Sequence, residues 1–260
     1  MSDGPEIVIS VRNLKVGYGQ TVILQDINFQ VECGEVFVIL GGSGSGKSTL
    51  LKTLIGLHEP LDGEVWIEGI NLVKADGDER RDLLRKFGVA YQSGALFGSM
   101  TVLENVRLPL DELTALPEPL KEISALAKLK LVGLGDAARK MPSELSGGMQ
   151  KRAAIARAMA LDPRILFLDE PSAGLDPITS ADLDLLITEL AHRFGITFVV
   201  VSHELASIYK IADRVIMLDG RSHRLVAEGH PADLRDHAAD PWVRRFFNRQ
   251  PDATASGLHL

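Results

Sequence analysis

A glycine-rich loop between an apolar run and a helical pattern is the feature that most restricts how this 260-residue chain can fold. Residues 39–50 read ILGGSGSGKSTL and match the spacing G-x-x-x-x-G-K-[ST] at Gly41, Gly46, Lys47 and Ser48. The run EVFVIL before the loop is typical of a short strand, and leucines recur at helical spacing in KSTLLKTLIGL after it. This order of strand, loop and helix predicts a phosphate-binding loop rather than a chance glycine turn.

The chemistry of the loop predicts how it binds a nucleoside triphosphate. Its glycines let backbone N–H groups turn inward, and the helix N-terminus adds a partial positive charge beside the phosphates. Lys47 supplies a full positive charge, and the Ser48 hydroxyl is a predicted Mg²⁺ ligand. The predicted nucleotide contacts of the loop are Gly41, Gly42, Ser43, Gly44, Ser45, Gly46, Lys47, Ser48 and Thr49.

At 260 residues the chain is long enough for one large α/β domain or two small ones, and a hydrophobic fraction of 45% supports an ample core. The net charge of −7 argues against a nucleic-acid partner, which usually requires a basic face. Cys33 is the single cysteine, so no intramolecular disulfide can form and a reducing compartment is expected. The acidic start MSDGPEIVIS is unlike a signal peptide, and no apolar run is long enough to span a bilayer. These features predict a soluble cytosolic chain.

We expect a single domain over residues 1–240. The first 40 residues are β-rich, and strands and helices alternate after residue 164, which implies βαβ units and a largely parallel core sheet. Between them, prolines punctuate helical stretches, so we expect an inserted helical subdomain at about residues 93–160.

The stretch ILFLDE, residues 165–170, predicts a buried strand that ends in two carboxylates. Ligands of α/β folds bind at such strand ends. Asp169 suits the Mg²⁺ shell, and Glu170 is placed to act as a general base on an attacking water. A helix cap or a solvated loop is the alternative for two adjacent acids, but the phosphate loop in the same chain favours the catalytic interpretation.

The stretch ELSGGMQKRAAIARAMA lies between these two elements and opens a helix. Here the sequence resembles the ATP-binding-cassette (ABC) family of transporter ATPases, whose signature is LSGGQ, and the resemblance covers residues 7–230. It implies a P-loop NTPase with a RecA-like core, an N-terminal antiparallel β-subdomain and an inserted α-helical signature subdomain. It also implies that Ser146, Gly147 and Gly148 contact ATP. The fifth signature position departs from the family, because it is Met149 and glutamine follows only at position 150.

Four further motifs of the family occur in the expected order. Tyr18 in VGYG corresponds to the aromatic residue that stacks on adenine, and Gln92 in VAYQSG corresponds to the Q-loop glutamine near Mg²⁺ and the attacking water. SAGLD, residues 172–176, corresponds to the D-loop, and His203 in VVVSHE to the switch histidine that contacts the γ-phosphate. The resemblance thus implies Glu170, His203 and Gln92 as catalytic residues, and Ser48, Gln92 and Asp169 as metal ligands.

One chain carries one phosphate loop and one signature, whereas the family completes each ATP site with the signature of the opposite subunit. The resemblance therefore implies a homodimer of ATPase subunits with two ATP molecules at the interface. Cassette ATPases of DNA repair or translation usually have two cassettes or a coiled-coil insert, and a P-loop kinase needs no LSGG helix. Both are weaker alternatives for this chain.

A closer resemblance to the ATPase subunits of bacterial Mla-type systems appears in YQSGALFGSMTVLENVRLPL, EPSAGLDPITS and DPWVRRFFNRQPDA. It implies phospholipid transport between membranes, with integral membrane permease subunits and an MCE-domain lipid-binding protein as partners. It places the chain peripherally at the cytoplasmic face of the inner membrane. An importer or exporter of another substrate is the alternative. Ala95, Leu96 and Phe97 either contact the permease or pack into the helical subdomain.

The tail, residues 241–260, combines aromatic and arginine residues that the cassette core does not require. Trp242, Phe246 and Phe247 would share an apolar stripe on a helix that begins near Pro241. Docking on the opposite ATPase subunit is the interpretation that the Mla-type resemblance implies, and aromatic and arginine residues are types that anchor interfaces. Packing on the chain's own cassette and attachment to a membrane surface are the alternatives.

Overall fold

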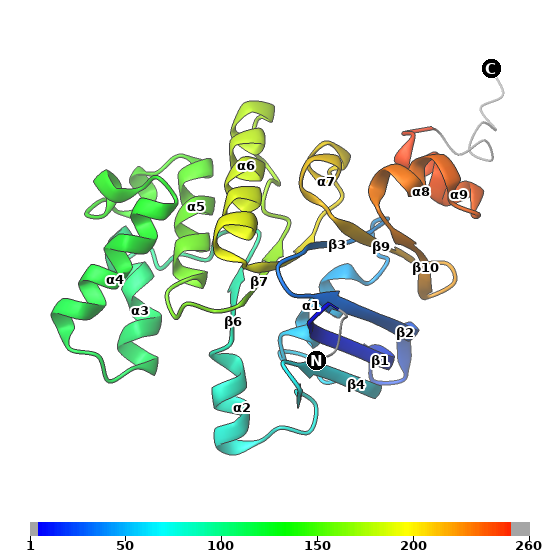
Figure 1. Ribbon diagram of the computed structural model, residues 1–260, viewed down its shortest axis with the longest axis horizontal. Helices are drawn as coiled ribbons and strands as arrows, with labels where there is room; N and C mark the ends of the chain where they lie inside the picture. Colours follow the sequence, from blue (N-terminus) through cyan, green and yellow to red (C-terminus); the bar gives the residue numbers. More distant parts are fainter. Residues whose placement is uncertain (1–4, 251–260) are drawn as a thin grey trace.

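The computed structural model describes residues 5–250, which form two β-sheets and the helices around them (Figure 1). The larger sheet has the strand order β10-β9-β3-β8-β7-β6, and all its strands are parallel except β10. Its strands are β3 (Val36–Gly41), β6 (Phe87–Ala90), β7 (Ile165–Asp169), β8 (Thr197–Val201), β9 (Arg214–Asp219) and β10 (Arg224–Gly229). The smaller sheet is antiparallel, with the order β2-β1-β4-β5. Its strands are β1 (Ile7–Tyr18), β2 (Thr21–Glu32), β4 (Asp62–Ile67) and β5 (Ile70–Asn71).

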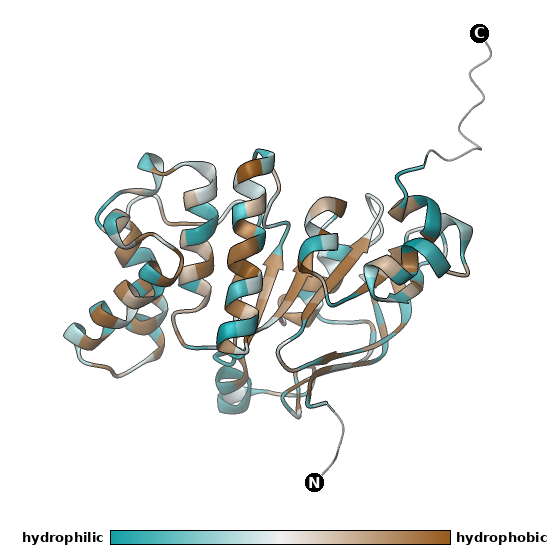
Figure 2. Ribbon diagram, turned by 45° about the horizontal axis from the view of Figure 1, so that its top comes forward, coloured by the Kyte–Doolittle hydropathy of each residue, from teal (hydrophilic) through white to brown (hydrophobic). Residues whose placement is uncertain are grey.

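The central strands of the larger sheet are buried on both faces, as their continuous apolar runs predict. Successive side chains of a strand point to opposite faces, and the core is accordingly divided in two. Phe37 and Ile39 belong to a cluster shared with the smaller sheet, whereas Val36 and Val38 belong to a cluster on the opposite face. Figure 2 shows hydrophobic residues concentrated on these strands.

Helices cover both faces of the larger sheet. α1 (Lys47–Leu54) lies between the two sheets, where its side chains Leu50, Leu51 and Leu54 are buried. The other face is covered by α6 (Pro177–Phe194), α7 (Leu205–Ile211) and part of α5 (Gly147–Ala158). α1 therefore joins the phosphate loop directly to the core.

Three helices follow β6 and lie beside the core, at the left of Figure 1. They are α3 (Val102–Leu113), α4 (Glu118–Leu131) and α5, with short 3₁₀ turns at Gly135–Ala137 and Pro142–Glu144. A further helix, α2 (Gly77–Leu84), precedes β6. Pro109 lies inside α3 rather than at its end, so this proline does not terminate the helix.

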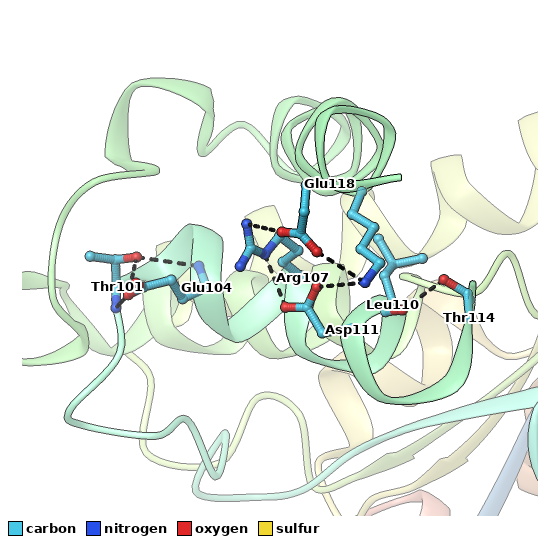
Figure 3. A network of polar contacts seen from close by, with 8 residues as sticks. Thr101, Glu104, Arg107, Leu110, Asp111, Thr114 and Glu118 are labelled. Carbon is cyan, nitrogen blue, oxygen red and sulfur yellow. Dashed lines mark hydrogen bonds and ion pairs between the residues drawn. The ribbon is translucent and has the colours of Figure 1, made fainter. Parts of the chain in front are cut away.

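Ion pairs join α3 to α4 (Figure 3). Arg107 Nε lies 3.0 Å from Asp111 Oδ2, and Arg107 Nη1 lies 3.2 Å from Glu118 Oε2. Lys121 Nζ contacts the same two carboxylates at 3.3 and 3.2 Å. At the start of α3, Thr101 and Glu104 form a reciprocal capping box, which satisfies backbone N–H groups of the first turn (Figure 3).

Asn105, fully buried in α3, fastens the loop that follows Gln92 to this helix. Its side-chain oxygen accepts a hydrogen bond of 2.7 Å from the Phe97 N–H. Its amide nitrogen lies 3.0–3.1 Å from the carbonyl oxygens of Phe97, Met100 and Thr101. The loop therefore has a fixed shape, which positions Phe97.

The C-terminal part differs from the sequence prediction. Pattern analysis overlooked β10 and α8 (Pro231–His237) but correctly predicted a helix beginning at Pro241, α9 (Pro241–Phe247). The buried face of α9 consists of Val243 and Phe247, whereas Trp242 and Phe246 are only partly buried. The three predicted aromatic residues all pack against the same apolar cluster, but the prediction omitted Val243, which is buried more deeply than Trp242 and Phe246. Residues 251–260 of the predicted tail lie outside the described residues.

Candidate functional site

The phosphate loop connects β3 to α1 and approaches its neighbours closely. Gly46 has a φ of 94°, and a Cβ atom on it would lie 2.8 Å from Ile23 Cγ2. A Cβ atom on Gly41 would meet the Leu218 carbonyl oxygen at 2.5 Å. The glycines at these two positions are therefore required by both conformation and space. Beside the loop lies a cavity of about 390 Å³, lined by residues 44–49, residues 21–23 and His223.

Lys47 and Ser45 are two loop residues whose polar groups can bind an anion. Lys47 Nζ donates hydrogen bonds of 2.9 Å to the carbonyl oxygens of Gly41 and Gly42. Burial lowers the pKa of Lys47, while the carboxylates of Glu170 and Asp169 act in the opposite direction. The Ser45 hydroxyl is buried, and within residues 5–250 it has no hydrogen-bond partner. A phosphate oxygen would provide the partner that this hydroxyl lacks.

The pairing of β7 with β8 brings Glu170 and His203 together. Asp169 pairs with Val201, so the residues that follow the two strands leave the sheet side by side. Nδ1 of His203 lies 2.8 Å from Oε1 of Glu170, and the glutamate side chain is only 14% exposed. Glu170 has a φ of +48°, a left-handed conformation that costs energy in residues other than glycine and that is often found at functional sites.

Asp169 lies beside the same strand end and has an environment suited to a cation. Burial and the neighbouring Glu170 raise the pKa of Asp169, whereas Lys52, Lys151 and Lys47 favour its ionised form. A bound cation would relieve the repulsion between the two carboxylates. The predicted donors, the Ser48 hydroxyl, the Gln92 amide oxygen and the Asp169 carboxylate, are oxygen ligands of the type that Mg²⁺ prefers. The residues present therefore fit this ion.

The loop that carries Gln92 is held by two cations of α5 that sequence analysis missed. Lys151 Nζ donates to the Gln92 carbonyl oxygen and lies 3.4 Å from that of Glu170. Arg157 donates to the carbonyl oxygens of Ala95 and Gly94 at 2.7 and 2.9 Å. Both residues belong to the signature stretch, but their partners are distant in the sequence. No local pattern indicates such contacts.

The signature residues lie at the start of α5. The Ser146 side chain caps the helix by accepting a hydrogen bond of 3.3 Å from the Met149 N–H. A Cβ atom on Gly148 would lie 2.3 Å from Thr179 Cγ2, so glycine is required for α5 to pack on α6. The Gln150 amide donates to the carbonyl oxygens of Pro142 and Leu145. Gln150 therefore stabilises the preceding turn and does not replace the missing glutamine at position 149.

The signature at the start of α5 and the phosphate loop before α1 form separate groups of polar contacts. No hydrogen bond or ion pair among the described residues joins Ser146, Gly147 or Gly148 to residues 41–49. In contrast, the predicted D-loop, Glu170 and His203 share a cavity of about 460 Å³, which Phe246 and Arg249 also line. Asp176, the last residue of the D-loop, caps α6 by accepting hydrogen bonds from the N–H groups of Ile178 and Thr179.

Tyr18 is positioned at the end of β1, where the predicted adenine contact is exposed. Its side chain is 52% exposed, and its ring centroid lies 4.6 Å from that of His58. The His58 Nε2 atom is 2.9 Å from the Gly17 carbonyl oxygen. The Tyr18 ring therefore meets the His58 ring at an angle of 47°, and it remains accessible to a base.

The larger sheet, the phosphate loop and the carboxylates that follow β7 define a P-loop nucleoside-triphosphatase. Residues 24–173 match the family model described as ABC transporter, and the chain belongs to this family. It is an ATP-binding cassette that hydrolyses ATP.

Similar proteins confirm the resemblance found in the sequence. The intermembrane phospholipid transport system ATP-binding protein MlaF of Escherichia coli is 40% identical over 93% of this chain and 88% of its own length. The probable ribonucleotide transport ATP-binding protein Mkl of Mycobacterium leprae is also 40% identical, over 93% of this chain and 69% of its own. A dimeric cassette solved in a post-hydrolysis state with ADP and phosphate is 34% identical, with a TM-score of 0.76, covering 85% of this chain and 98% of its own.

The contact between Glu170 and His203 predicts a specific kinetic defect. We expect Glu170→Gln to bind ATP normally but to hydrolyse it about 10²–10⁴-fold more slowly, because the amide keeps the shape of the side chain and cannot act as a base. ATP binding and phosphate release should be measured on the same preparation, with wild-type protein beside it. Turnover close to that of the wild type would exclude Glu170 as the general base.

Proposed function

We propose that this chain is the ATP-hydrolysing subunit of a bacterial Mla-type transporter and powers phospholipid transport between membranes. The observation that carries this proposal is the 40% identity to MlaF over most of both chains, 88% of the Escherichia coli protein and 92% of a 41% identical protein from Haemophilus influenzae. The Mkl relatives, named for ribonucleotide transport, are equally similar over a smaller share of their length. Ribonucleotide transport is therefore the second candidate.

In this proposal ATP occupies the cavity beside the phosphate loop. Lys47 and the backbone N–H groups of the loop bind the β- and γ-phosphates, and the exposed face of Tyr18 stacks on adenine. Ser48, Gln92 and Asp169 would hold Mg²⁺, which supplies charge stabilisation at the phosphates. Glu170 accepts a proton from the attacking water, while His203, hydrogen-bonded to it, is positioned to contact the γ-phosphate.

The separation of signature and phosphate loop within one chain supports a homodimeric site. The N-terminus of α5, capped by Ser146, offers backbone N–H groups to an anion that the same chain does not supply. In a two-fold dimer each chain would complete the other's site with Ser146, Gly147 and Gly148. The γ-phosphate then joins the two subunits, and its removal by hydrolysis loosens them.

An exposed apolar region near the Gln92 loop supports contact with permease subunits. Leu96 is partly buried against the core, but Phe97 remains 51% exposed although Asn105 fixes its backbone. Of the three apolar residues Ala95, Leu96 and Phe97, Leu96 packs partly into the fold, and we propose Phe97 for the contact with the permease. A groove of about 180 Å³ between β6 and α3, lined by Leu84, Pro109 and Leu113 among others, lies in the same part of the fold.

The membrane association follows from these partners. No helix within residues 5–250 is long and apolar enough to cross a bilayer. We therefore place the chain peripherally at the cytoplasmic face of the inner membrane, where it binds the permease. An MCE-domain lipid-binding protein, which exchanges lipid with the permease, completes the assembly that we propose.

The tail is proposed as a second contact between ATPase subunits. Val243 and Phe247 pack on the chain's own cassette, and the Tyr209 hydroxyl donates a hydrogen bond of 2.9 Å to the Phe247 carbonyl oxygen. Trp242 and Phe246 pack only partly against the same cluster, and we propose that the remainder of these side chains contacts the opposite subunit. Such a contact would keep the dimer together when ATP is absent.

Lipid transfer provides the test of the overall function. The chain is purified with its permease and MCE partners and reconstituted in vesicles, and transfer of a fluorescent phospholipid to acceptor vesicles is followed. We expect transfer that requires ATP and is lost with Glu170→Gln, because hydrolysis supplies the free energy. ATP-driven uptake of radiolabelled ribonucleotide without phospholipid transfer would contradict the proposal and favour the second candidate.

The permease contact can be tested with two exposed phenylalanines. Phe97→Ser is expected to reduce co-purification of the permease at least severalfold, because it removes the apolar anchor. Phe194→Ser is the matched control, since Phe194 at the end of α6 is 53% exposed and lies outside the proposed contact. Both variants should keep wild-type ATP binding. Equal permease recovery with the two variants would remove Phe97 from the interface.

The tail contact predicts an effect on assembly in the absence of nucleotide. We expect the pair Trp242→Ala and Phe246→Ala to weaken the nucleotide-free dimer, measured by light scattering, and to leave the monomer folded, because the buried Val243 and Phe247 remain in place. This pair is preferable to truncation after Asp240, which would also remove the buried Val243 and Phe247. A dimer of unchanged stability would restrict α9 to packing on its own cassette.

A further inference from the structure

The turn between β9 and β10 lies on the nucleotide cavity, although none of the motifs includes it. β9 ends at Asp219 and β10 begins at Arg224, so the turn comprises residues 220–223. His223 lines the cavity of about 390 Å³ together with residues 44–49 of the phosphate loop and residues 21–23 of β2. The position of the turn therefore affects the shape of the site.

One end of the turn is held against the phosphate loop. A Cβ atom on Gly220 would lie 3.4 Å from Ser45 Cα and 3.6 Å from the Gly44 carbonyl oxygen, so the two backbones are nearly in contact. The Asp219 carboxylate accepts hydrogen bonds of 3.1 and 3.0 Å from the N–H groups of Arg221 and Ser222. These contacts give the turn a defined conformation.

The other end is held against β2. The Gln25 N–H donates a hydrogen bond of 2.8 Å to the His223 carbonyl oxygen, and Arg224 Nη2 lies 2.6 Å from Asp26 Oδ2. His223 itself has a φ of +57°, which is rare for a residue with a side chain. An exposed turn residue is thus kept in a left-handed conformation by contacts on both sides.

The imidazole ring of His223 is also oriented. Its Nδ1 atom lies 2.9 Å from the Ile23 carbonyl oxygen, and a carbonyl can only accept, so Nδ1 carries the proton of the neutral ring. The Nε2 atom then presents a lone pair, and it has no hydrogen-bond partner within residues 5–250. The ring is exposed, so this lone pair is available to a ligand.

The place of His223 in the cavity indicates which part of the nucleotide it meets. The phosphate loop holds the β- and γ-phosphates at one end, and Tyr18, three residues before Thr21, stacks on the base at the other. Ile23, to which the ring is hydrogen-bonded, follows Tyr18 by five residues in the chain, and its side chain faces Gly46 of the phosphate loop, where an added Cβ atom would lie 2.8 Å from Ile23 Cγ2. The portion of ATP between the base and the β-phosphate comprises the ribose and the α-phosphate.

We infer that His223 is a further nucleotide-binding residue, whose Nε2 accepts a hydrogen bond from a ribose hydroxyl of ATP. The inference rests on the ATP site proposed above. The β9–β10 turn accordingly forms one side of the site and contacts the ribose, while the phosphate loop binds the phosphates.

Two substitutions separate this role from a structural one. In His223→Asn the side-chain amide can still donate to the Ile23 carbonyl oxygen in place of Nδ1, but it has no counterpart of Nε2. His223→Ala loses both interactions. His192→Asn is the control, because His192 is exposed on α6 and lies outside the cavity.

Dissociation constants for ATP, 2′-deoxy-ATP, 3′-deoxy-ATP and inorganic tripolyphosphate should be measured by titration, together with the KM and kcat of ATP hydrolysis. We expect His223→Asn and His223→Ala to weaken ATP binding about 3- to 10-fold, the loss of one hydrogen bond. The KM should rise with kcat unchanged, tripolyphosphate binding should be unaffected, and one of the deoxynucleotides should bind wild type and variant equally.

Wild-type ATP affinity in His223→Asn would overturn the inference, and so would an equal loss for tripolyphosphate, which would indicate a phosphate contact. Lys47→Ala distinguishes these results from a failure of the site itself. If Lys47→Ala also leaves ATP affinity unchanged, the proposed ATP site is wrong. If it abolishes binding while His223→Asn has no effect, only the role of His223 is excluded.

Discussion

The close approach of the phosphate loop to its two neighbouring strands is the constraint on which the rest of the structure depends. The loop has no room for a side chain beside Ile23 of β2 or beside Leu218 of β9, and these strands belong to different sheets. α1 continues from the loop and fills the space between the same two sheets with leucine side chains. The packing of the core and the shape of the nucleotide site are consequently determined together.

The signature helix α5 connects the helical subdomain to the loop that follows Gln92. It does so through two cationic side chains as well as through apolar contacts. Lys151 and Arg157 bind backbone carbonyl groups of the Gln92 loop, and burial lowers the pKa of both side chains. Both cations are half-buried, and separating them from these carbonyl groups would cost free energy, so we expect α5 and this loop to move together. In our proposal the same loop presents Phe97 to the permease. One loop therefore contacts both the ATP site and the membrane partner.

Much of the fold could be predicted from the sequence, because the signals were local. The phosphate loop, the apolar strands ending at Asp169 and Val201, and the helix starting at Pro241 each depend on patterns within a few residues. Lys47, Ser48, Asp169 and Glu170 could be named for the same reason, whereas Tyr18, Gln92, His203 and the signature residues were predicted from the resemblance to the family. Their mutual contacts could not, because the hydrogen bond between His203 and Glu170 arises from strand pairing across more than 30 residues.

Other parts escaped prediction for physical reasons of the same kind. Lys151 and His223 act on carbonyl groups that are distant in sequence, and neither shows a local pattern. β10 has no fully buried side chain, so its periodicity is weak, and the buried face of α9 became apparent only from what packs against it. Sequence patterns therefore identified most helices and strands, whereas tertiary contacts determined which side chains lie next to one another.

Side chains of the central strands alternate between two core clusters, and this alternation limits where residues can be inserted or deleted. An additional residue within β7 would exchange the side chains of its two faces and, in the same step, displace Glu170 from His203. A duplication or deletion of one codon there would damage folding and chemistry at once. The connection between α3 and α4, residues 114–117, carries no such register, so insertions and deletions among descendants of this gene are expected to accumulate there and not in the sheet.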